Sequence, residues 1–285
     1  MMLFSRRNLL LGAGAAGLAA CSRKGAAPRV SGPPNTIEEA VAGSWRLSQD
    51  RARDAFRHPV ESLKFWGLKP GMTVVEFWPG AGWYTDILAP FLAGTKGKLY
   101  AANLEPLDQA SREVVEAYKA RLAGKKRLYG DVTVTAFGPT SGPVAPAGTA
   151  DLALFLRNVH NWMAAGIIDK AFADAFAALR PGGVLGVEEH RAAPGEVQDA
   201  LAASGYVQQD YVIALAKEAG FVLDAASEIN ANPKDTKDHP FGVWTLPPTR
   251  LSAPRGRPAK EGFDHTKYDA IGESDRMTLR FRKPA

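Results

Sequence analysis

The sequence predicts a doubly wound α/β fold with a mostly parallel sheet, N-terminal helices and an insert before the last strand. Three observations predict it. Short apolar segments typical of buried strands alternate with helical segments, as crossover connections between parallel strands require. A glycine-rich turn follows the first predicted strand. Arg180-Pro181-Gly182-Gly183 then forms a second turn ahead of the fifth strand.

The first 20 residues are predicted to be an export signal. Ser5-Arg6-Arg7-Asn8-Leu9-Leu10 resembles a twin-arginine signal, and the apolar run Leu9–Ala20 is too short to span a membrane as a helix. Leu18-Ala19-Ala20-Cys21 resembles a lipobox, whose cysteine receives lipid after cleavage. We therefore expect a periplasmic lipoprotein, anchored to the bacterial envelope through Cys21. A chance cysteine in an apolar tail is the alternative.

The composition after the signal indicates one globular domain on a tether. Residues 21–35 are rich in Ala, Pro, Gly and Ser and predict a flexible tether, whereas residues 36–285 predict the domain. Loss of Arg6 and Arg7 with the signal lowers the formal charge from +5 to +3. The longest basic run, Gly124–Arg127, has no interleaved aromatic residues, so nucleic-acid binding is not expected.

The first part of the domain predicts three helical pieces. Thr36-Ile37-Glu38-Glu39 matches a capping box, which opens the first helix. The second piece ends at His58-Pro59. Pro59 suits the first position of the third helix, and Gly67 suits the position after its end.

Strands and helices alternate along the rest of the chain. Strands are expected over residues 73–77, 98–103, 132–137, 150–156, 184–189, 221–229 and 277–281, where apolar residues concentrate. Helices are expected over residues 84–92, 106–122, 164–179 and 208–219, with Pro or Gly at several of their ends. Residues 138–148 predict a loop, and residues 230–272 predict a polar insert.

Residues 74–84 form the most informative segment, a strand followed by a glycine-rich turn and a helix start. The segment resembles motif I of class I S-adenosylmethionine-dependent methyltransferases, in which an acidic residue ends the strand and a G-x-G-x-G turn follows. Glu76 stands at the acidic position and Trp78 at the first glycine position. Gly80 and Gly82 stand at the second and third glycine positions.

This resemblance covers about residues 58–230 and the last strand, and it implies a seven-stranded, methyltransferase-like Rossmann fold. Three motifs also resemble a group of predicted bacterial methyltransferases that are often exported. They are Pro79–Tyr84 (P-G-x-G-W-Y), Arg157–Trp162 (R-N-x-H-N-W) and Gly272–Arg276 (G-x-S-D-R).

The resemblance implies S-adenosylmethionine as cofactor. The implied binding residues are Glu76, Trp78, Gly80, Gly82, Asn103 and Glu105. The amides of the turn and the helix start would hold the amino-acid part of the cofactor. Asn103 or Glu105 would hold the ribose. For Gly80 and Gly82, the alternative is a tight strand–helix turn that binds no ligand. For Glu105, the alternative is an acidic residue at a helix N-terminus, where the helix dipole favours negative charge.

Polar residues follow the fourth and fifth strands, and ligands bind beyond the carboxyl ends of strands in open α/β sheets. We predict Asn158, His160 and His190 as catalytic residues of one cleft beside the glycine turn, covered by the insert around His239. His160 is the expected general base, because imidazole titrates near neutrality. The alternative is that the polar residues after the fourth strand only form hydrogen bonds to neighbouring loops. No metal is expected, because the tight ligand spacings H-x-x-x-H and C-x-x-C are missing.

The leading functional hypothesis is an exported S-adenosylmethionine-dependent methyltransferase acting on a small molecule or an envelope component. One alternative is a small-molecule-binding periplasmic lipoprotein without transfer activity. Another is a different enzyme that uses His160 and His190. Fold alone does not decide among them.

Overall fold

The computed structural model describes residues 32–285. The predicted signal, Cys21 and most of the tether lie outside the described residues. No helix within residues 32–285 is both long and apolar enough to cross a membrane.

The core of the domain is a seven-stranded sheet with the order β3-β2-β1-β4-β5-β8-β6. Neighbouring strands from β3 to β5 pair in parallel, whereas β8 is antiparallel to both β5 and β6. This arrangement confirms the predicted doubly wound, mostly parallel sheet. The strands of the sheet are β1 (Thr73–Phe77), β2 (Lys98–Leu104), β3 (Val132–Phe137), β4 (Ala150–Leu156), β5 (Leu179–His190), β6 (Val222–Ser227) and β8 (Arg276–Arg282).

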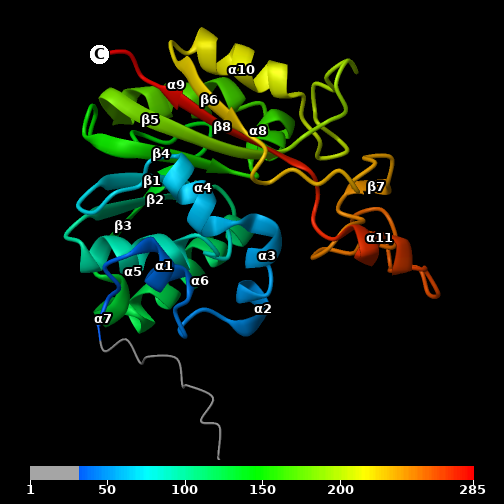
Figure 1. The fold of residues 1–285 in the computed structure, drawn as a ribbon, viewed down its shortest axis with the longest axis horizontal. Helices are drawn as coiled ribbons and strands as arrows, with labels where there is room; N and C mark the ends of the chain where they lie inside the picture. The colour runs from blue at the N-terminus through cyan, green and yellow to red at the C-terminus, as the bar shows by residue number, and fades with distance from the viewer. Residues whose placement is uncertain (1–31) are drawn as a thin grey trace, which may run out of the picture. The chain divides into compact units, whose positions relative to one another are not determined.

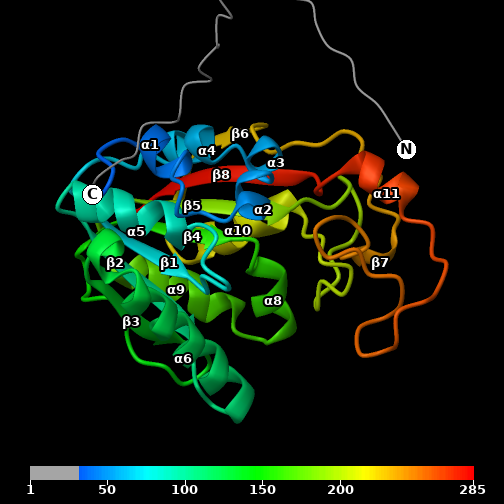
Figure 2. The same cartoon turned by 90° about the horizontal axis from the view of Figure 1, so that it is seen from below.

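Helices cover both faces of this sheet (Figures 1 and 2). One face carries α1 (Ile37–Val41), α4 (Pro59–Phe65), α5 (Thr85–Gly94), α6 (Gln109–Gly124) and α7 (Lys126–Tyr129). The other face carries α9 (Ile168–Ala178) and α10 (Gln209–Glu218). The short helices α2 (Ser48–Arg51) and α3 (Asp54–Arg57) precede α4.

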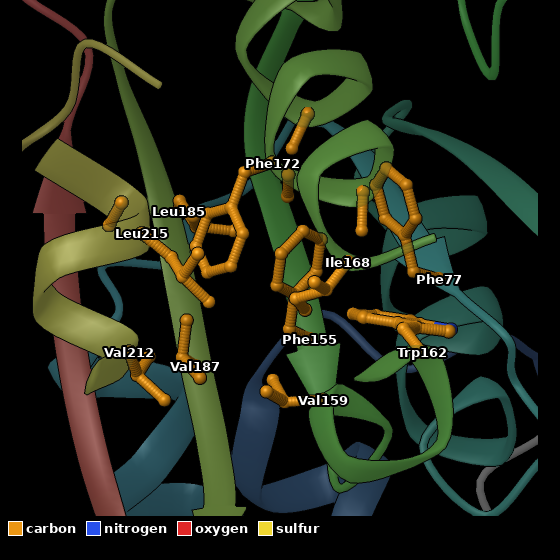
Figure 3. Packing of buried hydrophobic residues seen from close by; sticks show 14 of the residues in the cluster. Phe77, Phe155, Val159, Trp162, Ile168, Phe172, Leu185, Val187, Val212 and Leu215 are labelled. Atoms are coloured by element: carbon orange, nitrogen blue, oxygen red, sulfur yellow. The ribbon is translucent and has the colours of Figure 1, made fainter. Parts of the chain in front are cut away.

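Side-chain alternation along the strands builds one apolar core on each face. In β1, Val74 belongs to the core beneath α1, α4 and α5, whereas Val75 and Phe77 belong to the core beneath α9 and α10. Aromatic rings dominate the second core, where Phe155 lies 4.7 Å from Trp162 and 5.2 Å from Phe172 between ring centroids (Figure 3). The strands are therefore buried on both sides, as expected for a parallel sheet.

The N-terminal helices have the predicted ends. Thr36 and Glu39 form the capping box of α1, with both reciprocal hydrogen bonds present. His58 adopts a left-handed conformation with φ of 40°, which ends α3 and allows Pro59 to open α4. The indole of Trp45 donates to the Asp86 carbonyl at 2.8 Å, which ties this region to α5.

Three features differ from the sequence expectation. The polar residues after β4, for which no helix was expected before residue 164, form a helix, α8 (Val159–Ala164), because Val159, Trp162 and Met163 pack into the core at helical spacing. The insert contains a short strand, β7 (Pro240–Val243), and a helix, α11 (Thr266–Ile271). Strand β5 begins at Leu179 instead of 184, so it includes the predicted turn.

A test of the sheet–helix packing uses Gly186 in β5. A Cβ at this position would lie 2.6 Å from Cγ of Trp66 and 2.9 Å from Cδ2 of Leu154. Trp66 is fully buried, and its indole donates to the Leu279 carbonyl at 3.1 Å, so the ring has little freedom to move. We expect Gly186→Ala to lower the free energy of unfolding by about 1–3 kcal/mol in urea denaturation.

Gly124→Ala is the matched control, because Gly124 ends α6 and has no neighbour within 4 Å of the added methyl group. It should leave the free energy of unfolding nearly unchanged or raise it slightly. Equal denaturation midpoints for the two variants would contradict this packing.

Candidate functional site

The centre of the candidate site is a buried carboxylate, Glu189, at the end of β5. Its Oε1 accepts from His160 Nδ1 at 2.9 Å and from the His190 amide at 2.8 Å. Its Oε2 accepts from the Val159 amide at 2.6 Å and more weakly from the His160 amide at 3.4 Å. Four N–H groups thus satisfy a side chain with no exposed surface, as a buried carboxylate requires.

This arrangement selects the tautomer of His160. A carboxylate only accepts hydrogen bonds, so Nδ1 of His160 carries the proton that faces Glu189. The other ring nitrogen, Nε2, is then the basic one. His160 is 5% exposed and lines a cavity.

His190 lies beside His160, with 5.3 Å between ring centroids. Its Nδ1 is 2.5 Å from Oγ of Ser274. Burial, with the added effect of His160 and the nearby Arg276 and Arg157, holds the pKa of His190 well below its usual value. His190 is therefore neutral at neutral pH.

Both histidines line one cavity of about 240 Å³ at the carboxyl end of β4 and β5. The expected shared cleft is thus present, and the insert covers it through Val243, Trp244 and Pro247–Thr249. These residues follow His239 in the insert, as expected. His239 itself is not in the lining, and its Nε2 is 2.8 Å from Asp235 inside the insert.

Arginines form much of the remaining wall. The cavity is lined by Arg53, Arg57, Arg157 and Arg255, together with Glu273 and Ser274. Arg53 and Arg57 contact Glu273 through Nε at 2.6 and 2.9 Å. Arg157 contacts the fully buried Glu188 at 3.0 Å, and the Tyr84 hydroxyl also donates to Glu188 at 3.0 Å.

The glycine turn has the backbone that its sequence predicts. Gly80 and Gly82 have φ of 57° and 84°, and Trp78 has a left-handed φ of 43° at the position of the first glycine. A Cβ on Gly80 would meet nothing within 4 Å, so this glycine leaves open space. Gly82 instead faces Arg121 of α6, which bonds to the Ala81 carbonyl and the Asp86 carboxylate.

Trp78 turns its side chain toward the end of β3. The indole donates to the Phe137 carbonyl at 2.9 Å, and its ring packs 6.1 Å from Phe137 and 6.0 Å from Trp162 between centroids. The side chain is half-buried. Trp78 therefore fills space between the ends of β1 and β3.

Glu76 points into the protein instead of toward the open side of the turn. It is 2% exposed, and Thr85 at the start of α5 donates to it at 2.7 Å. Burial raises the pKa of Glu76 to about 7, although the Thr85 hydrogen bond opposes this effect.

Asn103 and Glu105 lie at the end of β2, as predicted, but both use internal partners. Oδ1 of Asn103 accepts from the Leu104 amide at 2.7 Å, whereas its buried Nδ2 has no partner within residues 32–285. Glu105 accepts from the Thr140 amide at 3.0 Å and from the Thr140 hydroxyl. The NH2 group of Asn103 thus makes no hydrogen bond within the described residues.

Asn158 joins the glycine turn to the histidine segment. Its Nδ2 donates to the Trp78 carbonyl at 3.0 Å, and its Oδ1 accepts from Asn161 at 3.2 Å. Asn158 is absent from the cavity lining, which includes Arg157, His160 and Asn161. The residues of the glycine turn are also absent from the cavity lining. The cavity therefore lies at the ends of β4 and β5, beside the turn that follows β1. The catalytic role of Asn158 stays a prediction.

His160, Glu189 and His190 also form a group whose possible ligand atoms lie within 4.8 Å of one another. Because both oxygens of Glu189 already accept N–H groups, this geometry favours a carboxylate that orients His160 over a metal ligand.

Sequence reasoning missed Arg53 and Arg57, which reach the site from the α2–α3 region, far away in the chain. No local motif marks them. Ser274 lies in the motif Gly272–Arg276 singled out from the sequence. Strand alternation alone would place Glu189 and His190 on opposite faces, yet both lie close to His160 because β5 ends there.

No family model and no curated protein matches the sequence. Among solved structures, the chain is similar to a protein from Galdieria sulphuraria assigned as a sarcosine dimethylglycine methyltransferase. That match has 15% identity and a TM-score of 0.52, and it covers 90% of this chain and 94% of that one. A SAM-dependent methyltransferase from Aquifex aeolicus matches at 20% identity and a TM-score of 0.49, over 63% and 87% of the two chains. The first likeness shows the methyltransferase-like Rossmann fold.

The raised pKa of Glu76 predicts a pH-dependent difference between the wild type and Glu76→Gln, which stays neutral at every pH. The unfolded carboxyl has a pKa near 4.5, and the folded one has a pKa of about 7. The folded state therefore binds the extra proton, and its stabilisation is full below about pH 4.5 and lost as pH rises through 7. The free energy of unfolding of the wild type should fall relative to the variant by about 3 kcal/mol across this window.

Urea denaturation of both proteins between pH 4 and 8 measures this difference. The comparison cancels the contribution of His190, which both proteins share. Stability curves that run parallel across the window would show that Glu76 is ionised in the folded protein.

Proposed function

We propose that the protein is an S-adenosylmethionine-dependent methyltransferase that acts on a small molecule or an envelope component, with His160 as general base. The observation that carries this proposal is the Glu189-oriented His160 at the same sheet edge as the glycine turn, with Asn158 bonded between the two. The methyltransferase-like fold supports it.

Several residues fit the cofactor. Gly80 offers open space at the turn, where the amides and the start of α5 suit the amino-acid part. The unpartnered Nδ2 of Asn103 suits a ribose hydroxyl at the end of β2. Trp78 is the exception, because an adenine near the end of β3 must stack on its indole or displace it from Phe137.

When bound, S-adenosylmethionine supplies an electrophilic methyl group. The chain's own residues prepare the acceptor. His160 takes the proton of an acceptor O–H or N–H group at Nε2, while Glu189 keeps Nδ1 protonated and stabilises the imidazolium that results. Neutral His190, bonded to Ser274, adds a polar group without adding positive charge. Trp244 and neighbouring residues of the insert form part of the wall that would enclose the acceptor.

A small-molecule-binding protein without transfer activity is the second candidate. Trp78 favours this candidate. It stands at the position of the first glycine, and its indole donates to the Phe137 carbonyl, so its side chain would close a nucleotide site at this point. In that case the arginine-lined cavity binds its ligand, and His160 serves to orient it.

We also propose that the protein is exported by the twin-arginine route and anchored through lipid on Cys21. The support is the order of signal, apolar run and single cysteine in residues 1–21. Twin-arginine export carries folded proteins, so a bound cofactor would be carried with the protein.

Titration with S-adenosylhomocysteine by isothermal calorimetry tests the proposed function. The wild type should bind it, and Gly80→Val should reduce the affinity at least tenfold, because a branched side chain would fill the open space at the turn. Gly142→Val is the control, since Gly142 also has open space but lies in the loop after β3. No binding by the wild type at high micromolar ligand would exclude the transferase and leave the second candidate.

Cell fractionation tests the anchor. The wild type should be found in membranes with a lipid-bearing Cys21 as first residue, whereas Cys21→Ser should be found in the soluble periplasmic fraction, because the serine cannot receive the lipid. Ser22→Ala serves as the control and should behave as the wild type. A wild type without lipid by mass spectrometry, or a Cys21→Ser protein that stays in membranes, contradicts the proposal.

A further inference from the structure

The cavity beside His160 is unusual in its charge. Its arginines come from distant parts of the chain: Arg53 and Arg57 from the α2–α3 region, Arg157 from the end of β4, and Arg255 from the insert. A fifth arginine, Arg276 at the start of β8, is buried next to the cavity. It contacts Glu273 at 2.8 Å and Glu188 at 3.3 Å. Guanidinium groups therefore surround the cavity on several sides.

Positive charge exceeds negative charge in this region. The guanidinium groups are those of Arg53, Arg57, Arg157, Arg255 and Arg276, and the carboxylates that meet them or line the site are Glu188, Glu189 and Glu273. Five positive and three negative groups leave an excess of two positive charges, because His190 is neutral. Arg57, Arg157 and Arg276 match the three carboxylates in number, so the excess is carried by the half-buried Arg53 and the exposed Arg255, where an anion from solvent can compensate it.

The arginines also keep donors for such an anion. Arg53 and Arg57 use Nε for Glu273, so their Nη groups remain available to an acceptor in the cavity. Arg157 uses one Nη group for Glu188. Arg255 makes no ion pair within residues 32–285, and its guanidinium lies 4.0 Å from the Trp244 ring centroid. Stacking on the indole holds Arg255 at the rim.

We propose that this cavity binds a phosphate monoester, with the dianionic phosphate held by Arg53, Arg57, Arg157 and Arg255 and the rest of the ligand beside His160. Two charges in one tetrahedral group match the excess, and guanidinium forks are suited to phosphate oxygens. The cavity volume of about 240 Å³ limits the ligand to a small molecule or a lipid headgroup. This identification of the substrate class rests on the proposed function, in which His160 deprotonates the acceptor.

Binding measurements on the full chain with Cys21→Ser test the proposal, so that a lipid anchor does not mask the result. Glycerol 1-phosphate is the soluble probe, titrated by calorimetry. Vesicles of phosphatidylcholine with and without phosphatidic acid are the membrane probe, followed by co-sedimentation. The variant is Arg255→Gln, at the exposed rim, where the arginine stacks on Trp244 and makes no ion pair within residues 32–285. Arg257→Gln, two residues away, exposed and outside the cavity lining, is the matched control.

We expect binding of at least one probe, an affinity loss of about tenfold or more in Arg255→Gln, and a change of less than about twofold in Arg257→Gln. Binding of glycerol 1-phosphate identifies a soluble ester as ligand. Arg255-dependent binding of only the phosphatidic acid vesicles identifies a lipid headgroup. Failure of both probes, or equal losses in the two variants, overturns the proposal.

Titration of the same samples with S-adenosylhomocysteine separates this proposal from the proposed function. Phosphate binding without S-adenosylhomocysteine binding would retain the anion site and refute the transferase. S-adenosylhomocysteine binding without phosphate binding would retain the transferase and refute the anion site.

Discussion

The candidate site depends on one buried carboxylate. Glu189 ends β5 with no exposed surface and is held by N–H groups of Val159, His160 and His190. Without these donors its burial would be strongly unfavourable, so the start of α8, the ring of His160 and the end of β5 have to stay in register. The same hydrogen bonds leave Nε2 of His160 without a proton, which is the state that the proposed general base requires.

The sheet explains how distant segments meet around this carboxylate. Strand β8 runs antiparallel to β5, with His190 opposite Arg276, so Ser274 and Glu273 arrive beside the ends of β4 and β5. The α2–α3 region adds Arg53 and Arg57 through their contacts with Glu273. The site thus combines His160 from the start of α8 with Glu189 and His190 from the end of β5. The segment before β8 adds Glu273 and Ser274.

The fold was largely predictable because its signals are local. The limits of β1, β3 and β4 follow from apolar runs, and those of α4 follow from Pro59 and Gly67. The site was predictable only where residues follow strand ends, as His160 and His190 do. The role of Arg53 could not be predicted, because it depends on an ion pair with Glu273, 220 residues away in the chain. The role of Trp78 depends equally on a tertiary contact, with Phe137.

The tautomer of His160 tests the central claim most directly. In the ¹⁵N-labelled protein at neutral pH, two-dimensional NMR of the imidazole rings distinguishes a protonated from an unprotonated ring nitrogen, and the absence of one spin system in His160→Gln assigns the signal. The account predicts a protonated Nδ1 and an unprotonated Nε2, since Nδ1 donates to Glu189 at 2.9 Å. A protonated Nε2 with an unprotonated Nδ1 would contradict it, because His160 would then have no basic nitrogen at the cavity.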